Sequence, residues 1–180
     1  MRLKSMAVSA AGFCLLVIVQ AAAAAPPKDA CDLPQDLQGE ITSKYPGAKL
    51  VSLLDLGEHG KGLFQKDHGN ACPGSVKVDF YGDGKPTLAL VLITKDRAKQ
   101  KSQLVVAREM GGTWKARVLD TVEGWPVPVV WREDPGEYQD VYGEKKIRAR
   151  TPVIVFCGYE AWAILYAWTG KNVTKIWIAD

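Results

Sequence analysis

The sequence predicts an α+β fold in which an N-terminal helix packs on a twisted, mainly antiparallel β-sheet of hairpins. An apolar stripe with helical spacing lies near the start of the chain. From residue 75 onward, apolar and polar residues alternate in runs of strand length. Tight turns join neighbouring runs and no long helical crossover separates them, which favours antiparallel pairing. A β-sandwich or a partial barrel is the alternative arrangement.

The helix is expected between residues 32 and 45. Leu33, Leu37 and Ile41 recur every four residues and form one apolar face. The helix must end at Tyr45-Pro46, because the residue before a proline avoids the α region. Lys49–Leu56 then reads as a strand, with a second short helix as the less favoured alternative. Residues 57–74 contain five glycines and little apolar periodicity, which predicts a long loop with at most one helical turn.

The strands that follow are assigned from alternation and from turn residues. Gly111-Gly112 and Thr169–Asn172 are expected to be the turns of two hairpins. Pro126 and Pro128 restrict the segment around them to an edge strand or extended chain, and residues 132–146 are expected to be a loop. The remaining predicted strands cover residues 75–81, 88–93, 104–110, 113–120, 152–157, 161–168 and 173–178.

The first 25 residues have the three regions of a secretory signal peptide. Arg2 and Lys4 form a basic start, Ala11–Val19 an apolar core, and Ala21–Ala25 a small-residue cleavage zone. We therefore expect a secreted or periplasmic protein, with residues 1–25 removed and residues 26–180 forming a single domain. A bilayer-spanning helix needs about 20 apolar residues. Neither this core nor any later segment is that long, so we expect no stable membrane insertion after signal removal.

Charge and motifs exclude several classes of function. The chain has 23 Lys and Arg against 20 Asp and Glu, and losing Arg2 and Lys4 leaves 21 − 20 = +1. A nearly neutral domain has no electrostatic basis for binding nucleic acid. The sequence contains no G-x-S-x-G elbow, P-loop or dinucleotide fingerprint, so it predicts no catalytic residues and no cofactor.

Three cysteines remain after the signal peptide: Cys31, Cys72 and Cys157. An oxidising compartment favours one disulfide and one unpaired thiol. We expect the Cys72–Cys157 bond, since both lie beside predicted strands, with Cys31–Cys72 as the alternative. No metal site is predicted, because no C-x-x-C or H-E-x-x-H spacing is present.

Two short segments resemble parts of known families. Asp79–Pro86 resembles the calcium loops of FG-GAP and VCBS-type repeats, but Tyr81 replaces one ligand and Thr87 stands where another acid is usual. We expect a hairpin turn there, with Asp83-Gly84 supplying the positive φ angles. Ile41–Ala48 resembles the helix-to-strand boundary of PepSY-like periplasmic domains. That resemblance implies a small exported binding or inhibitory domain. The whole chain resembles exported bacterial proteins.

The six tryptophans are the most prominent candidates for ligand contacts. Strand alternation places Trp162, Tyr166 and Trp168 on one face of a predicted strand, with Trp177 near them on the next. This row either fills the core or forms a stacking platform for a sugar, and the core is favoured because large exposed apolar patches are rare. Ligand-binding residues, if the row is a platform, are these four.

The sequence therefore predicts an exported, non-enzymatic binding or interaction domain whose partner is a protein or a carbohydrate. The alternative is a secreted hydrolase that acts on envelope or extracellular polymer, with its acids in the Arg132–Asp140 segment.

Overall fold

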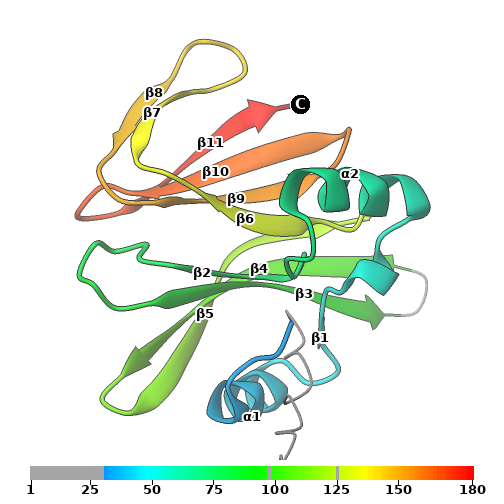
Figure 1. Cartoon of the computed structure of the whole chain (residues 1–180). Coiled ribbons are helices and arrows are strands. Elements are labelled where there is room, and N and C mark those ends of the chain that lie inside the picture. The colour runs from blue at the N-terminus through cyan, green and yellow to red at the C-terminus, as the bar shows by residue number, and fades with distance from the viewer. Residues whose placement is uncertain (1–30, 97–98, 125) are drawn as a thin grey trace, which may run out of the picture.

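The computed structural model describes residues 31–96, 99–124 and 126–180 (Figure 1). The predicted signal peptide lies outside these residues. Within the described part of the chain, no helix is both long enough and apolar enough to cross a membrane. The elements in chain order are α1 (Gln35–Lys44), β1 (Lys49–Leu50), a 3-10 helix (Leu53–Asp55), α2 (Glu58–His68), β2 (Ser75–Val78), β3 (Thr87–Asp96), β4 (Lys99–Met110), β5 (Thr113–Glu123), β6 (Val129–Glu133), β7 (Gly136–Gln139), β8 (Lys146–Ala149), β9 (Val153–Gly158), β10 (Trp162–Trp168) and β11 (Val173–Ala179).

The first sheet has the strand order β1-β3-β4-β5. β2 also pairs with β3, on the same side of β3 as β1. All its pairs are antiparallel. β3 and β4 pair along their whole length, from Thr87 opposite Arg108 to Asp96 opposite Lys99. A bulge between Leu104 and Val105 shifts the β4–β5 register.

The second sheet has the order β11-β10-β9-β6, again antiparallel throughout. β7 and β8 form a separate two-stranded arm that projects beyond this sheet (Figure 1). The arm reaches the outer edge of β11, where the backbone N–H of Val141 donates to the Trp177 carbonyl over 2.8 Å.

The two sheets pack face to face over one large core. Val91 and Val106 of the first sheet belong to the same buried cluster as Phe156 and Ile164 of the second. The outer face of the first sheet carries a smaller cluster, in which Leu37 and Ile41 of α1 meet apolar side chains of β3, β4 and β5. α1, the first sheet and the second sheet therefore form successive layers, and α2 lies beside β6 (Figure 1).

A lysine covers a carbonyl on the outer strand of each sheet. The Lys44 ammonium donates to the backbone carbonyl of Ala116 in β5. The Lys145 ammonium donates to the carbonyl of Lys175 in β11 over 3.1 Å. Both contacts place a charged side chain on the backbone of a strand at the edge of its sheet.

The mainly antiparallel β structure is confirmed, and four other predictions are wrong. The single predicted sheet is two facing sheets, as in the sandwich alternative. The predicted loop at 57–74 contains α2, which is anchored by the fully buried Phe64 despite Gly60 and Gly62 in its interior. The predicted loop at 132–146 contains β7, and Lys49–Leu56 is only a two-residue strand followed by a 3-10 turn.

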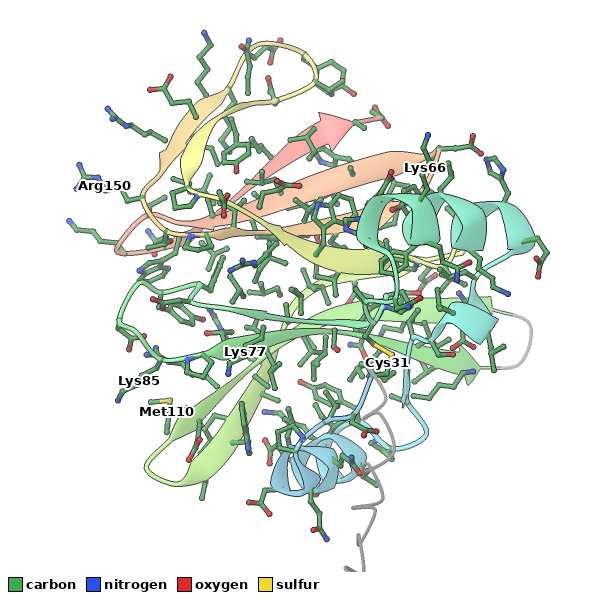
Figure 2. All side chains as sticks on the ribbon, viewed as in Figure 1. Cys31, Lys66, Lys77, Lys85, Met110 and Arg150 are labelled. Carbon is green, nitrogen blue, oxygen red and sulfur yellow. A yellow bond between two sulfur atoms is a disulfide. The ribbon has the colours of Figure 1, made fainter. Side chains whose placement is uncertain are left out.

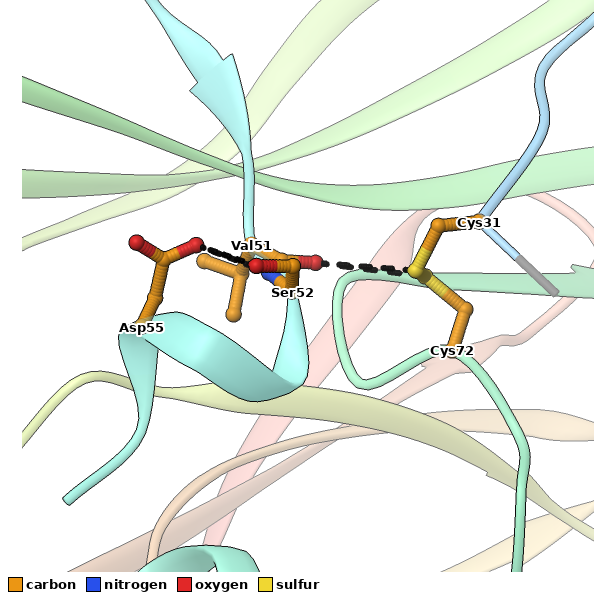
Figure 3. Close-up of a disulfide and its surroundings, with 5 residues drawn as sticks. All are labelled: Cys31, Val51, Ser52, Asp55 and Cys72. Carbon is orange, nitrogen blue, oxygen red and sulfur yellow. Dashed lines mark hydrogen bonds between the residues drawn. A yellow bond between two sulfur atoms is a disulfide. The ribbon is translucent and has the colours of Figure 1, made fainter. Parts of the chain in front are cut away.

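The predicted Cys72–Cys157 disulfide is also wrong. Cys72 is bonded to Cys31, with their Cα atoms 4.9 Å apart (Figure 3). Cys157 is an unpaired buried thiol. Cys157 lies inside β9 of the second sheet, whereas Cys72 lies in the loop that leads into β2 of the first. Proximity to the chain start argued against Cys31, but both bonded sulfur atoms lie close to the backbone carbonyl of Val51, which places Cys31 against the folded body.

Candidate anion-binding pocket

In the loop between β2 and β3, side chains accept hydrogen bonds from the loop's own backbone. The Asp79 carboxylate accepts hydrogen bonds from the backbone N–H groups of Asp83, over 3.2 Å, and Gly84, over 3.1 Å. The positive φ angles belong to Gly82, at 69°, and Gly84, at 75°, rather than to Asp83-Gly84 as expected. A Cβ atom on Gly82 would lie 2.4 Å from Cγ2 of Thr151, so only glycine fits there.

This loop places Tyr81 between the two sheets. Its ring meets the edge of the Trp168 ring from β10, with centroids 5.1 Å apart. The Arg108 guanidinium of β4 lies over the Tyr81 ring, 4.7 Å from its centroid. Arg117 of β5 donates through Nη2 to the Tyr81 hydroxyl over 3.0 Å. One tyrosine therefore orients two arginines from neighbouring strands and connects them to the second sheet.

A pocket of about 160 Å³ opens beside Tyr81 at this end of the inter-sheet core. Arg108, Lys115 and Arg117 supply three cationic groups to its wall, and Met110 stands at its rim, 59% exposed. Met110 and Lys85 of the β2–β3 loop lie at the same end of the first sheet (Figure 2). The remaining lining residues are Tyr81, Thr87, Val106 and Ala116.

Strand register explains how these side chains come together. Thr87 lies opposite Arg108 across β3 and β4, and Arg108 lies opposite Lys115 across β4 and β5. Arg117 is two residues from Lys115 and therefore shares its face. Among the residues that the structure describes, one carboxylate pairs with these cations: Asp83 accepts from Nη2 of Arg108. The local charge is positive, so the pocket favours an anion.

Two polar atoms of the pocket residues have no hydrogen-bond partner among the residues that the structure describes. They are the hydroxyl oxygen of Thr87 and Nε of Arg108, and both atoms are buried. Thr87 itself has 0% exposure. Burying a polar group without a partner costs roughly 1–3 kcal/mol. Both atoms lie within the wall of the pocket and do not reach its open space.

The predicted aromatic row lies on the face of β10 that points toward the first sheet. Tyr166 is only 2% exposed, and its hydroxyl donates to the Asp120 carboxylate of β5. Trp162 is half-buried between Phe156 and Trp177, whose ring is 39% exposed. Trp168 is half-buried against Tyr81. Only Trp177 presents a large open surface, and Trp168 reaches the pocket through Tyr81.

The carboxylate of Asp120 in β5 accepts several hydrogen bonds, one of them from β11. Asp120 accepts hydrogen bonds from both Tyr166 and Lys175, and from the backbone N–H of Thr121 over 2.8 Å. Burial alone would raise the pKa of Asp120, but these bonds lower it overall. Burial and the same Asp120 contact raise the pKa of Tyr166. The two groups form a polar connection between the sheets.

The histidines and cysteines do not form one site. Cys72 is in the disulfide, and His68 lies between the rings of Phe64 and Trp131, 4.9 and 5.0 Å from their centroids. His59 instead pairs with Glu160 over 2.8 Å. In the described parts of the chain, no cluster of three or more His, Cys, Asp or Glu residues could hold a metal ion.

A second pocket, of about 250 Å³, lies where α2 begins. Glu58, His59 and Glu160 contribute to its wall, together with apolar side chains from Leu56, Pro126, Val127 and Tyr159. Glu160 has a φ of 60°, an unusual value for a residue other than glycine. The acids predicted in the 132–140 segment lie elsewhere: Glu133 accepts from Nε1 of Trp131 over 2.7 Å, and the carboxylate of Asp140 accepts from the backbone N–H of Lys145 over 3.1 Å.

Comparison of the chain with protein-family models, with curated proteins and with solved structures found no match. The pocket therefore has to be interpreted from its own chemistry.

Sequence reasoning missed Thr87, Arg108, Lys115 and Arg117, although one signal was present. A hairpin turning at Gly111-Gly112 places Arg108 directly opposite Lys115. Like charges that face each other across two strands are destabilising. Such a pair on a predicted hairpin indicates a compensating anion, either from the protein or from a ligand.

Proposed function

We propose that this chain is an exported, non-enzymatic binding domain that holds an anionic group of its ligand in the pocket beside Tyr81. The observation that supports this proposal is the donor set itself. Arg108, Lys115 and Arg117 converge on one pocket. The Ile41–Ala48 resemblance to PepSY-like domains points to the same class of function.

The partner is a protein or a carbohydrate that carries the anion. A ligand longer than the pocket would follow β5 from Arg117 toward Asp120 and then meet β11. Lys175 bridges to Asp120 there, and its ammonium lies 5.5 Å from the ring centroid of Trp177. Trp177 is an exposed aromatic on this side and is the proposed contact for an apolar or sugar face of the ligand. The Trp162 ring packs edge-to-face against the Trp177 ring.

Replacing Arg117 with glutamine is expected to weaken anion binding by at least tenfold, since a hydrogen bond from a charged donor contributes roughly 1.5–3 kcal/mol. The measurement is a ¹H–¹⁵N NMR titration of residues 26–180 with sodium phosphate, sulfate and acetate at constant ionic strength. At least one anion should shift the amide signals of Thr87, Arg108 and Lys115.

Arg148→Gln is the matched control, because Arg148 is an exposed arginine of the β7–β8 arm. It should bind anions like the unaltered protein. If no anion shifts the pocket signals, or if Arg148→Gln weakens binding as much as Arg117→Gln, the anion-binding function is wrong.

The hydrolase alternative is supported by one observation, the second pocket. Glu58, His59 and Glu160 line it together, and a histidine beside carboxylates is a common acid–base arrangement. Glu160 has a positive φ, and non-glycine residues with such a φ are enriched at functional sites. An enzyme would release soluble fragments from envelope polymer, and His59→Gln and Glu160→Gln would each abolish that release while leaving anion binding unchanged.

A further inference from the structure

Another cationic pocket, here called the Lys77 pocket, adjoins the anion pocket at the β2–β3 loop. It has a volume of about 370 Å³ and is lined by Lys77, Val78, Asp79, Gly84, Pro86 and Arg132. Pro86 lines the Lys77 pocket, whereas the next residue, Thr87, lines the anion pocket. Consecutive Cα atoms are about 3.8 Å apart, so the two pockets are immediate neighbours.

The cations of the Lys77 pocket are open to a ligand. Lys77 and Arg132 are exposed, and neither pairs with a carboxylate among the residues that the structure describes. Asp79 contributes a carboxylate to the wall, but its oxygens already accept from two backbone N–H groups of the loop. Lys85, in the same loop, is exposed as well (Figure 2).

The two pockets gather five cationic side chains around one loop, from strands of both sheets: Lys77, Arg108, Lys115, Arg117 and Arg132. The net charge of +1 for residues 26–180 does not reveal this concentration, because it averages over the whole domain. A ligand with anionic groups at two positions engages both pockets, and its second contact is made without a second loss of translational freedom. The surface therefore fits a ligand with repeated negative charges.

We infer that the ligand is an acidic oligosaccharide that places one anionic group in the anion pocket and another in the Lys77 pocket. This inference rests on the proposed anion-binding function and names its ligand class. Protein interfaces are built around apolar anchors, and lysine is depleted in them. The Lys77 pocket offers few such anchors, since Val78 is only 2% exposed. An acidic sugar chain instead uses charge-assisted hydrogen bonds, which exposed lysine and arginine side chains supply.

Oligogalacturonates are suitable probes because they carry one carboxylate on each sugar. In an NMR titration of residues 26–180 at pH 7.5, galacturonic acid should shift the amide signals of the anion pocket. Hexagalacturonate should also shift those of Lys77, Gly84 and Arg132, with one hexasaccharide bound per protein. It should bind at least about 100-fold more tightly than galacturonic acid at the same ionic strength. Maltohexaose, an uncharged chain of the same length, should not bind.

Arg132→Gln is the decisive variant because Arg132 lies outside the anion pocket. Its dissociation constant for hexagalacturonate should rise about tenfold, whereas that for galacturonic acid should not change. Lys66→Gln is the matched control, since Lys66 is an exposed cation of α2, away from the β2–β3 loop (Figure 2). It should bind both probes like the unaltered protein.

The outcomes separate the inference from the function on which it rests. Hexagalacturonate that binds no more tightly than galacturonic acid, or that binds Arg132→Gln with unchanged affinity, overturns the inference. The proposed function survives that result if Arg117→Gln still weakens the binding of single anions. Tighter binding of hexaglutamate, or of phosphatidylglycerol vesicles, than of hexagalacturonate overturns the assignment to a carbohydrate. Failure of every anion to bind overturns both.

Discussion

Replacing Cys31 and Cys72 together with serine is expected to lower the free energy of unfolding by about 4 kcal/mol. The bond joins residues 41 positions apart, and it removes conformational freedom from the unfolded chain rather than adding a large contact to the folded one. The chain-entropy relation for a loop of this length gives the stated value. Urea unfolding at pH 7 measures it as a lower midpoint.

Cys157→Ala is the control, and it also distinguishes the two possible pairings. Burial raises the pKa of the Cys157 thiol to about 12, so this thiol is protonated at pH 7 and does not exchange readily. A reducing agent should destabilise the unaltered protein and Cys157→Ala by the same amount. If Cys157→Ala instead removed the response to reductant, Cys157 would be part of the bond and the Cys31–Cys72 pairing would be incorrect.

Asp120→Ala is expected to cost about 2–3 kcal/mol of stability. The substitution leaves the Tyr166 hydroxyl buried without its acceptor and separates Lys175 from its carboxylate. Tyr166 and Asp120 belong to opposite sheets, so losing this bond weakens the contact between the sheets. The unfolding transition should therefore become less cooperative. A double-mutant cycle with Tyr166→Phe isolates this bond, and a coupling energy near zero would show that it contributes nothing.

The Asp120 contribution should also depend on pH. Its pKa is lower in the folded protein than in the unfolded chain, where a carboxyl titrates near 3.9. The stabilisation is therefore complete when the pH is above the pKa of Asp120 in the unfolded chain. It is lost as the pH falls through the lower pKa of Asp120 in the folded protein. The stability difference between the unaltered protein and Asp120→Asn should shrink below about pH 4. Glu144→Gln, at an exposed arm residue, should show no such difference; a constant difference for Asp120→Asn down to pH 2 would contradict the assignment.

The parts of the fold that were predictable have strong local signals. α1 ends at Lys44, directly before the Tyr45-Pro46 pair that predicts its end, and the hairpins at Gly111-Gly112 and Thr169–Asn172 form as expected. α2 was missed because Gly60 and Gly62 lower its helix propensity, and burial of one side chain, Phe64, offsets this only in the folded protein.

The candidate site depends on strand register and on contacts between the two sheets, neither of which a single sequence specifies. Tyr81 could be placed on a turn, but its contacts with Trp168 require the two sheets to face each other. Thr87 directly precedes the strand predicted at 88–93, yet its burial opposite Arg108 follows from the β3–β4 register. The aromatic row could be assigned to one face of β10, whereas the acceptor for its buried Tyr166 hydroxyl lies in the other sheet.

The lysines at the two outer strands have a consequence for how this protein meets other polypeptides. With Lys44 on the Ala116 carbonyl and Lys145 on the Lys175 carbonyl, an incoming strand would have to displace a charged group at either edge before it could pair. Sheet-to-sheet association between copies, and capture of an extended peptide by strand addition, are both opposed at these positions. At these two edges, a polypeptide ligand is therefore expected to be recognised through its side-chain charges rather than by strand pairing.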